Sequence, residues 1–242
     1  MQSHLEARLH LGIIMDGNGR WAVAQGRPRI EGHRAGLRAA RALVERLDQS
    51  PVHTLTLYAF SADNWKRPAG EVSGLMDLFE RFLRNDLSAL ARQGVRLTVI
   101  GRRDRLPAGL VAAIAAAERA TAGAQRKHLR IAADYSSRWA IVQAAHKSRP
   151  CDDLHAFGAA LAPDTDRPSI DLLIRTGGEQ RLSDFMLWEA AYAEIFFTAI
   201  PWPAFGPDDL AAALRWYAGR DRRFGRIHDA KNNDNTPVCA ER

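Results

Sequence analysis

The sequence predicts a single α/β domain in which a mostly parallel β-sheet is flanked by helices. Apolar segments of strand length alternate along the chain with helical patterns, and this order is typical of βαβ units. The strand-like segments hardly alternate between apolar and polar residues, as expected for strands buried on both faces. The length of 242 residues suits one large domain, and no repeat or long linker divides it.

Six segments are predicted to be strands because β-branched and aromatic residues are frequent in them. In chain order they are residues 9–15, 53–60, 95–100, 129–133, 170–174 and 194–198. The spacing of apolar residues predicts helices at 33–47, 71–92, 107–122, 136–147 and 207–221. The domain is expected to span residues 1–226, and the polar segment 227–242 is expected to be a disordered tail.

The composition is that of a soluble globular protein, with 46% hydrophobic and 26% charged residues. No stretch approaches the apolar length that spans a bilayer, and the first residues do not resemble a secretory signal. Only two cysteines occur, Cys151 and Cys239, which suits a reducing cytoplasm. The net charge of +6 suits an anionic partner, but it does not distinguish nucleic acid, a lipid headgroup or a small phosphate.

Residues suited to phosphate chemistry follow the first predicted strand, in residues 16–21 (DGNGRW). Ligands of parallel sheets bind beyond the carboxyl ends of the strands. Two glycines allow a tight turn that brings N–H groups close to an anion, and Arg20 adds donors that match phosphate. Asp16 is placed to hold a hard cation such as Mg²⁺ against a diphosphate. The alternative is a turn in which Asp16 and Asn18 cap the next helix.

Two later strand ends carry similar residues. Residues 61–68 (SADNWKRP) combine polar groups with a Trp, cations and a Pro, as a rigid loop in a substrate cleft does; an Asx turn with Trp65 as a hydrophobic plug is the alternative. Residues 175–183 (RTGGEQRLS) place two arginines around a Gly-Gly turn, where they could grip one phosphate or form an exposed salt-bridged loop. No Walker A or dinucleotide pattern occurs, so the combination favours an enzyme that acts on phosphorylated small molecules.

Three blocks of the chain resemble the cis-prenyltransferase (undecaprenyl diphosphate synthase) family. Residues 10–21 (HLGIIMDGNGRW) resemble its opening signature, which continues here through Gly26, Arg29, Gly32, His33 and Gly36. Residues 58–68 resemble its second block, and residues 174–179 with Arg181 and Ser183 resemble its closing signature. Residues 187–203 and 222–225 continue the likeness, which therefore covers about residues 10–225 in order.

The resemblance implies a six-stranded, mostly parallel sheet with a hydrophobic tunnel for the growing chain, in a homodimer. It implies condensation of isopentenyl diphosphate with an allylic diphosphate such as farnesyl diphosphate, giving a cis-polyprenyl diphosphate such as undecaprenyl diphosphate. Mg²⁺ is the implied cofactor, and contact with a membrane surface through the product is a further implication. Nucleic acid is not an expected partner, because the sequence has no helix with a basic stripe and no aromatic stacking platform.

The resemblance also implies roles for individual residues. Asp16 would hold Mg²⁺ and assist the departing diphosphate, and Asn64 would orient the water or diphosphate that takes the proton. The residues expected to bind the allylic substrate are Gly17, Asn18, Gly19, Arg20, Trp21, Arg29 and His33. Those of the second block expected to bind substrate are Ser61, Ala62, Asp63, Trp65 and Arg67. Those expected to bind isopentenyl diphosphate are Arg175, Arg181, Leu182 and Ser183. Glu194 matches a second metal-linked carboxylate, with a salt-bridged Glu as the alternative, and Arg223 and Gly225 match an element that can reach a partner's site.

Some residues depart from the family pattern. Residues 134–138 (DYSSR) stand where the family usually has Asn-Tyr-Gly-Gly-Arg, and the loss of two glycines stiffens the turn. Asp63 replaces a frequent Glu, and Gln180 replaces a His of some members. A short-chain or irregular enzyme that uses dimethylallyl or geranyl diphosphate is therefore an alternative, and a noncatalytic partner subunit is a more distant one. Products are expected to be no longer than about eleven isoprene units, with Phe82 either the floor of the tunnel or part of the core.

Overall fold

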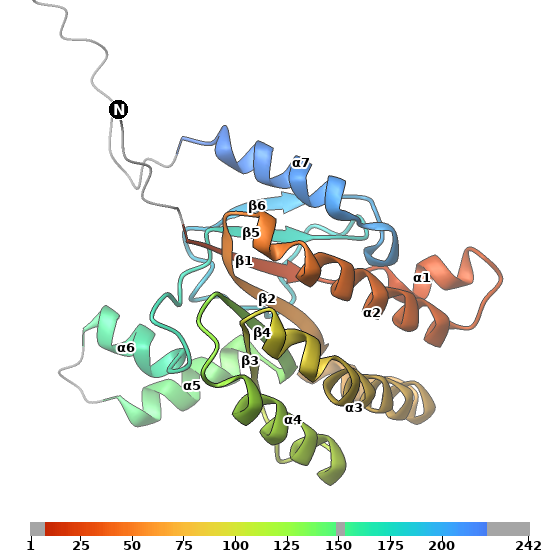
Figure 1. The fold of residues 1–242 in the computed structure, drawn as a ribbon, viewed down its shortest axis with the longest axis horizontal. Helices are drawn as coiled ribbons and strands as arrows, with labels where there is room; N and C mark the ends of the chain where they lie inside the picture. Colours follow the sequence, from red (N-terminus) through yellow and green to blue (C-terminus); the bar gives the residue numbers. More distant parts are fainter. Residues whose placement is uncertain (1–7, 149–152, 222–242) are drawn as a thin grey trace, which may run out of the picture.

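A computed structural model describes residues 8–148 and 153–221. Its strands form one parallel sheet in the order β3-β4-β2-β1-β5-β6 (Figure 1). The strands are β1 (Leu9–Ile14), β2 (Val52–Ser61), β3 (Val95–Ile100), β4 (Lys127–Tyr135), β5 (Leu172–Arg175) and β6 (Glu194–Phe197). All six predicted strands are present, and every pairing between them is parallel.

The strand order reverses at β1, and this reversal fixes where a ligand can bind. The chain first moves from β1 to β2, and it returns later to the other side of β1 as β5. In open parallel sheets the ligand crevice lies outside the carboxyl ends of the strands at such a reversal. Ile14 at the end of β1 pairs with Arg175 at the end of β5, so the segments that follow these two strands begin side by side.

Helices lie on both sides of the sheet (Figure 1). In the part of the chain that the structure describes they are α1 (Asn18–Val23), α2 (Arg29–Glu45), α3 (Ala69–Arg92), α4 (Ala108–Thr121), α5 (Ser137–Lys147), α6 (Leu154–Leu161) and α7 (Pro207–Ala218), with short 3₁₀ segments η1 (Leu47–Gln49), η2 (Ala62–Lys66) and η3 (Trp202–Ala204). The five predicted helices are confirmed as α2, α3, α4, α5 and α7. Two further helices, α1 and α6, are too short for their apolar spacing to have indicated them.

The two faces of the sheet differ in chemistry, because successive side chains of a strand point to opposite faces. On one face, Leu11, Leu55 and Leu129 lie in register and belong to the main core with residues of α2, α3, α4 and α7. On the other face, Thr56 and Arg130 lie in register, and each is at most 1% exposed. The strands are thus buried on both faces as predicted. The second face is polar at this level, and toward the carboxyl ends of the strands it carries a second core cluster that includes Tyr58 and Phe185.

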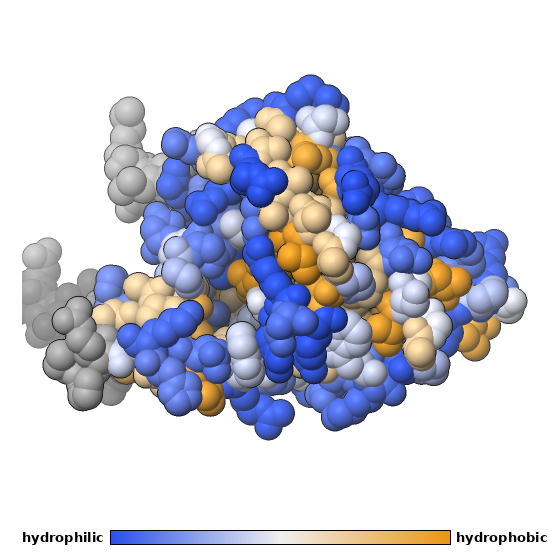
Figure 2. All heavy atoms as spheres, turned by 90° about the horizontal axis from the view of Figure 1, so that it is seen from below, coloured by the Kyte–Doolittle hydropathy of each residue, from blue (hydrophilic) through white to orange (hydrophobic). Residues whose placement is uncertain are grey.

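Figure 2, which is seen from below the view of Figure 1, shows hydrophobic residues interspersed with hydrophilic ones on this face. Among the described residues, the structure contains no helix that is long and apolar enough to span a membrane. The expected tail at 227–242 and the C-terminal element with Arg223 and Gly225 lie outside the described residues.

Candidate active site

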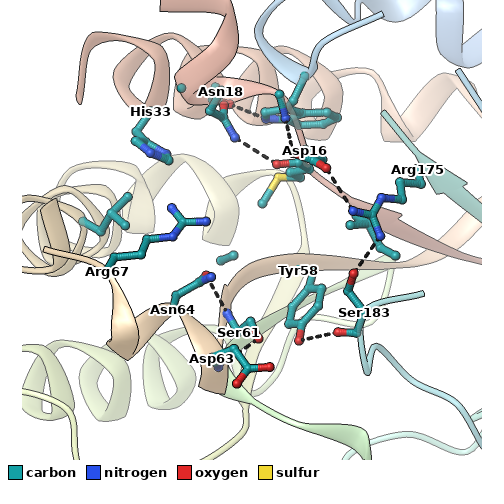
Figure 3. Close-up of a pocket in the computed structure, with 18 of the residues that line it drawn as sticks. Asp16, Asn18, His33, Tyr58, Ser61, Asp63, Asn64, Arg67, Arg175 and Ser183 are labelled. Atoms are coloured by element: carbon teal, nitrogen blue, oxygen red, sulfur yellow. Dashed lines mark hydrogen bonds and ion pairs between the residues drawn. The ribbon is translucent and has the colours of Figure 1, made fainter. Parts of the chain in front are cut away.

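A cleft of about 640 Å³ opens at the carboxyl ends of β1, β2 and β5, beside the point where the strand order reverses (Figure 3). Its volume lies within the range of roughly 300–1,000 Å³ that is common for ligand pockets. Most of the predicted site residues line it: Asp16, Gly17, Asn18, Gly19, Arg20, Arg29, His33, Ser61, Asp63, Asn64, Arg67, Arg175, Arg181 and Ser183. The fold therefore brings residues from three distant segments into one cleft at the strand ends, where ligands of parallel sheets bind.

Asp16 and Arg175 form the centre of this cleft. The Arg175 Nη2 atom donates to Asp16 Oδ2 at 3.0 Å, and the two residues are 159 positions apart in the chain. The other oxygen, Asp16 Oδ1, accepts from the backbone N–H of Gly17 at 2.6 Å and lies 3.2 Å from Arg20 Nη2. Burial raises the pKa of Asp16, but these donors and positive charges outweigh it and hold the pKa below its ordinary value. Asp16 is therefore ionised at neutral pH.

Arg175 is held in place by the loop that follows it. The side chain is 3% exposed, and its Nη1 atom donates to Ser183 Oγ at 2.8 Å and to the backbone carbonyl of Arg181. Its Nε atom is buried without a hydrogen-bond partner among the described residues. Figure 3 shows the guanidinium between Asp16 and Ser183. A cation fixed in this way offers a preorganised contact for an anionic substrate.

The turn after β1 differs from the loop expected from the sequence, because α1 begins inside it. Gly17 is the residue before the helix and has a φ of 99°, a conformation that favours glycine. No side chain caps α1, so the alternative in which Asp16 and Asn18 cap the helix is not what forms. Asn18 Nδ2 instead donates to the carbonyl of Met15 at 2.9 Å. A Cβ atom at Gly32 would lie 1.9 Å from the Asn18 carbonyl oxygen, so α2 can approach this turn only with glycine there.

The sequence did not single out Glu71, which organises the other side of the cleft. Its carboxylate is 12% exposed and lies 3.2 Å from Arg29 Nε, 3.0 Å from Arg67 Nη1 and 3.5 Å from His33 Nε2. Burial, followed by the positive charge of Arg67, lowers the pKa of His33, so this imidazole is neutral at pH 7. The position of Glu71 four residues after Arg67, at the start of a helix, was the available signal.

The second block folds as a capped 3₁₀ turn, η2. Ser61 Oγ accepts from the N–H of Asp63 at 3.1 Å, and Asn64 Oδ1 accepts from the N–H of Ser61 at 3.0 Å. Trp65 turns away from the cleft: it packs edge-on against Phe60, with ring centres 5.2 Å apart, and is not among the lining residues. For Trp65 the alternative of a hydrophobic plug therefore describes the structure better than a substrate contact.

Four other predicted residues are also absent from the lining of the cleft: Trp21, Ala62, Leu182 and Glu194. Leu182 packs against the second core cluster. Glu194 begins β6 and lies in register with Leu172, which in turn pairs with Leu11. Asp16 comes five positions after Leu11, so the two carboxylates are separated by roughly 16 Å along the strands. Glu194 forms an ion pair with Arg220 at 3.0 Å, as the salt-bridge alternative predicted, and within one chain it cannot share a metal ion with Asp16.

The segment that departs from the family pattern is built into the site. Asp134 is fully buried, has a φ of 49°, and accepts from Trp65 Nε1 at 2.9 Å and from Arg105. Ser136 Oγ donates to Asp184 Oδ2 at 2.5 Å, and Ser137 Oγ accepts from the N–H of Leu187 at 2.9 Å. The two serines therefore join the start of α5 to the segment that carries Ser183.

The charge and lining of the cleft suit a substrate that is anionic at one end and apolar at the other. Its arginines are Arg20, Arg29, Arg67, Arg138, Arg175 and Arg181, against the carboxylates of Asp16, Asp63 and Asp184. The apolar residues that α2 and α3 contribute to the cleft are Leu37, Ala40, Leu75, Leu78 and Phe79. Of the predicted tunnel wall, Leu75 and Phe79 thus line the cleft, whereas Phe82 is 6% exposed and belongs to the core.

Asp16 is the residue of the cleft that would hold a metal ion. Among the described residues, no three His, Cys, Asp or Glu side chains are grouped as a metal site. Mg²⁺ is commonly held by one or two carboxylates together with phosphate oxygens and water, rather than by a complete cage of side chains. The Asp16 carboxylate, 31% exposed at the cleft, fits this arrangement.

Comparison with known proteins agrees with this arrangement of residues. A family model described as "Putative undecaprenyl diphosphate synthase" matches residues 14–225. The chain belongs to this family. Isoprenyl transferase 1 of Bradyrhizobium diazoefficiens is 53% identical over 232 residues, which cover 94% of each chain. The (2E,6E)-farnesyl-diphosphate-specific ditrans,polycis-undecaprenyl-diphosphate synthase of Pseudomonas aeruginosa is 43% identical over 239 residues, 95% of each chain.

A solved structure is also similar to this one. Lavandulyl diphosphate synthase from Lavandula x intermedia, in complex with dimethylallyl diphosphate, superposes with a TM-score of 0.88 at 37% identity, covering 91% of this chain and 99% of that one. The resemblance predicted from the three motifs is confirmed, and the chain is a cis-prenyltransferase of the undecaprenyl diphosphate synthase family.

Proposed function

We propose that this cis-prenyltransferase condenses isopentenyl diphosphate with an allylic diphosphate, such as farnesyl diphosphate, to give a cis-polyprenyl diphosphate such as undecaprenyl diphosphate. The observation that carries this proposal is the division of the cleft into a cationic end, with six arginines, and an apolar end between α2 and α3. A prenyl diphosphate has the same division. The names of the curated relatives support the same reaction class.

We assign two diphosphate subsites to the cationic end. The allylic diphosphate would bind beside the turn after β1, with the Arg29 and His33 side chains that Glu71 holds. Isopentenyl diphosphate would bind to Arg175, Arg181 and the Ser183 hydroxyl. The support for the second subsite is the fixed position of Arg175, which already donates to Ser183 Oγ and therefore loses little side-chain entropy on binding.

In the proposed reaction the C–O bond of the allylic diphosphate breaks and diphosphate leaves with the bonding electrons. The double bond of isopentenyl diphosphate forms the new C–C bond, and a proton then leaves to a water molecule or diphosphate oriented by Asn64. Arginines fixed around the leaving group stabilise the negative charge that develops on it. Asp16 would hold Mg²⁺, which, when bound, would supply further positive charge at the departing oxygen.

We also propose that two copies of the chain associate through α5, α6 and residues 187–192. This face carries five large apolar side chains that are each between 36% and 76% exposed: Trp139, Val142, Leu154, Leu187 and Tyr192. The segments form one surface, because the ring of Phe157 of α6 packs against Trp188 with the ring centres 4.6 Å apart, and Ser137 of α5 accepts from the N–H of Leu187. Light scattering is expected to give the mass of a dimer and, for Val142→Asp, that of a monomer; a wild-type monomer would refute this assignment.

We place the enzyme in the cytoplasm, where its product would bring it to the membrane surface.

A second candidate function is supported by the comparison with lavandulyl diphosphate synthase, whose structure holds dimethylallyl diphosphate. On that reading, the chain would use a five- or ten-carbon primer and make a short or irregular product. A noncatalytic role is disfavoured, because Asp16 and the arginines that surround it are all present in the cleft.

A single assay distinguishes these candidates. The purified chain is incubated with Mg²⁺, labelled isopentenyl diphosphate and, in separate reactions, primers of five, ten and fifteen carbons, and the products are sized by chromatography. Incorporation with the fifteen-carbon primer to long products supports the proposal. Short products from the five-carbon primer alone would support the second candidate, and no product from any primer would refute both.

A further inference from the structure

A second cleft, of about 580 Å³, lies at the opposite end of the sheet from the active site. It is lined by residues that precede or begin β1, β2, β3 and β4 and by the loop after α6: Arg8, His53, Thr54, Arg96, Ala124, Gln125, Lys127, His128, Pro163, Asp164, Thr165 and Asp166. The ten residues of β2 separate the two clefts, which is a distance of roughly 30 Å. The active-site chemistry does not use these residues.

The floor of the second cleft is a buried polar network that neutralises one of its two carboxylates. Arg130, 1% exposed, donates through Nε and Nη2 to Asp164 at 2.7 and 2.9 Å. Thr98 Oγ1 donates to the same carboxylate at 3.0 Å. The Arg130 Nη1 atom is buried and has no hydrogen-bond partner in the described part of the chain. The charge of Asp164 is therefore balanced within the network.

The walls of the second cleft carry positive charge that is not balanced in the same way. Arg8 and Arg96 form no hydrogen bond or salt bridge with another described residue. Lys127 directs its ammonium group to the backbone carbonyls of Ser50 and Val52, at 3.1 and 2.8 Å. Asp166 is the remaining carboxylate of the lining. The guanidinium groups of Arg8 and Arg96 thus share a concave site with one remaining carboxylate, which is an arrangement that attracts anions.

Two imidazoles complete the lining. Burial lowers the pKa of His128 to about 4; Asp164 opposes this effect, and Arg130 and Arg96 add to it. The pKa of His53 is lowered by burial and then by Arg8 and Lys127.

The same acidic and basic neighbours set how His53 would respond to a ligand. Asp166 raises its pKa and Arg167 lowers it, so the balance around this imidazole is positive. An anion placed in the cleft would offset the nearby positive charges and favour the protonated imidazoles. Binding would therefore take up protons and become tighter as the pH falls.

We propose that this second cleft binds a small multivalent phosphate, of the size of inorganic diphosphate, at a site separate from the catalytic cleft. Guanidinium groups match the oxygens of phosphate with paired donors, and Arg8 and Arg96 are the two guanidinium groups of the lining. The proposal does not depend on which prenyl substrates the catalytic cleft accepts.

Histidine resonances make the test local. The full chain, with ¹³C-labelled histidine, is titrated with inorganic diphosphate at a series of pH values, and the resonances of His53 and His128 are followed by NMR. His33 reports on the catalytic cleft in the same spectra. Diphosphate is expected to raise the pKa of His53. For each unit of that rise, diphosphate binds the form with a protonated His53 about tenfold more tightly than the form with a neutral His53.

Variants assign the response to the second cleft. Arg96→Gln is expected to weaken the response of His53 by about tenfold or more, and to leave prenyl transfer unchanged. Arg215→Gln, an exposed arginine of α7 that lines neither cleft, is the matched control and is expected to change neither. Should Arg96→Gln fold poorly, Arg8→Gln at the exposed end of the lining gives the same test. The proposal is overturned if only His33 responds, or if sodium chloride of equal ionic strength gives the same shifts.

Discussion

Two phenylalanines one turn apart on α3 test what limits the length of the product. Phe79 lines the apolar end of the catalytic cleft, whereas Phe82 is 6% exposed and packs in the main core. The sequence left open whether Phe82 was a tunnel floor or a core residue, and its burial favours the core. We therefore expect Phe79, and not Phe82, to contact the growing chain.

The two truncations should have opposite consequences. Replacing the benzyl side chain by a methyl group removes the whole ring, which is about as many carbons as one isoprene unit contains, so Phe79→Ala should shift the products to longer chains. Phe82→Ala should instead leave the products unchanged and lower the free energy of unfolding by about 3–5 kcal/mol, the usual cost for a buried ring. For a chain of this size each kcal/mol lowers Tm by about 2–4 °C, so a fall of roughly 6–20 °C is expected.

Product sizing and thermal unfolding of both variants give the result directly. Unchanged products from Phe79→Ala together with longer products from a stable Phe82→Ala enzyme would reverse the assignment. Wild-type products well beyond about eleven isoprene units would refute the expected length limit, which rests on overlap between the chain and the wall of the cleft.

Three further predictions follow from the site and the core. Asp16→Ala should lower kcat by on the order of 10³-fold or more with the fold intact by circular dichroism, and full activity in excess EDTA would contradict the role of Mg²⁺. Arg181→Ala and Arg175→Ala should each raise the KM for isopentenyl diphosphate by the equivalent of roughly 2–4 kcal/mol, and Arg175→Ala also removes a partner of Asp16. Arg29→Ala should instead raise mainly the KM for the allylic substrate. Equal effects of these variants on both substrates would refute the two subsites. Burial raises the pKa of Asp164, but the charge and hydrogen bonds of Arg130 outweigh it and lower the pKa to about 2. The stabilising contribution of Asp164 should therefore be present above about pH 4 and lost as the pH falls toward 2. Asp164→Asn should reduce the fall in the free energy of unfolding over that range, as measured by urea titrations.

The sequence predicted the strands and the three chemical segments well, because buried parallel strands have a strong apolar pattern. No local pattern in the sequence predicted which strands are neighbours in the sheet. The contact between Asp16 and Arg175 arises from that order, since β5 returns to the free side of β1. Once the rule that ligands bind at the reversal of strand order is applied, the contact of these two side chains follows from the fold.

The residues that sequence reasoning misplaced have a common physical cause. Glu194 stands in a strongly matching segment, but it begins its strand, and only the register shows that this end of the strand lies away from Asp16. Trp65 stands between polar residues of the second block, but its indole nitrogen is used by the buried Asp134. Glu71 was overlooked because its helix was interpreted through its apolar face alone. In each case the direction of a side chain decides the role, and residue type and spacing do not specify that direction.

Ser136 and Ser137, which stand where the family has a Gly-Gly pair, form hydrogen bonds to a neighbouring segment with strained backbone conformations. Ser183, Asp184 and Met186 all have positive φ values, between 46° and 62°, and such conformations cost about 1–3 kcal/mol each for residues other than glycine. Ser136 donates to the Asp184 carboxylate, and Ser137 accepts from the N–H of the next residue after this segment. Glycines could supply neither side-chain bond.

The strained segment positions the hydroxyl of Ser183, which in turn accepts from Arg175, the residue that also contacts Asp16. A second contact holds the same segment, since the Tyr58 hydroxyl donates to the Ser183 carbonyl at 3.2 Å. The two serines therefore replace the flexibility of the glycines with hydrogen bonds, and the bond from Ser136 ends at Asp184, next to Ser183 of the proposed isopentenyl diphosphate subsite. In this chain the departure stabilises the geometry of the cleft, so it is compatible with catalysis even though it removes the family's usual turn.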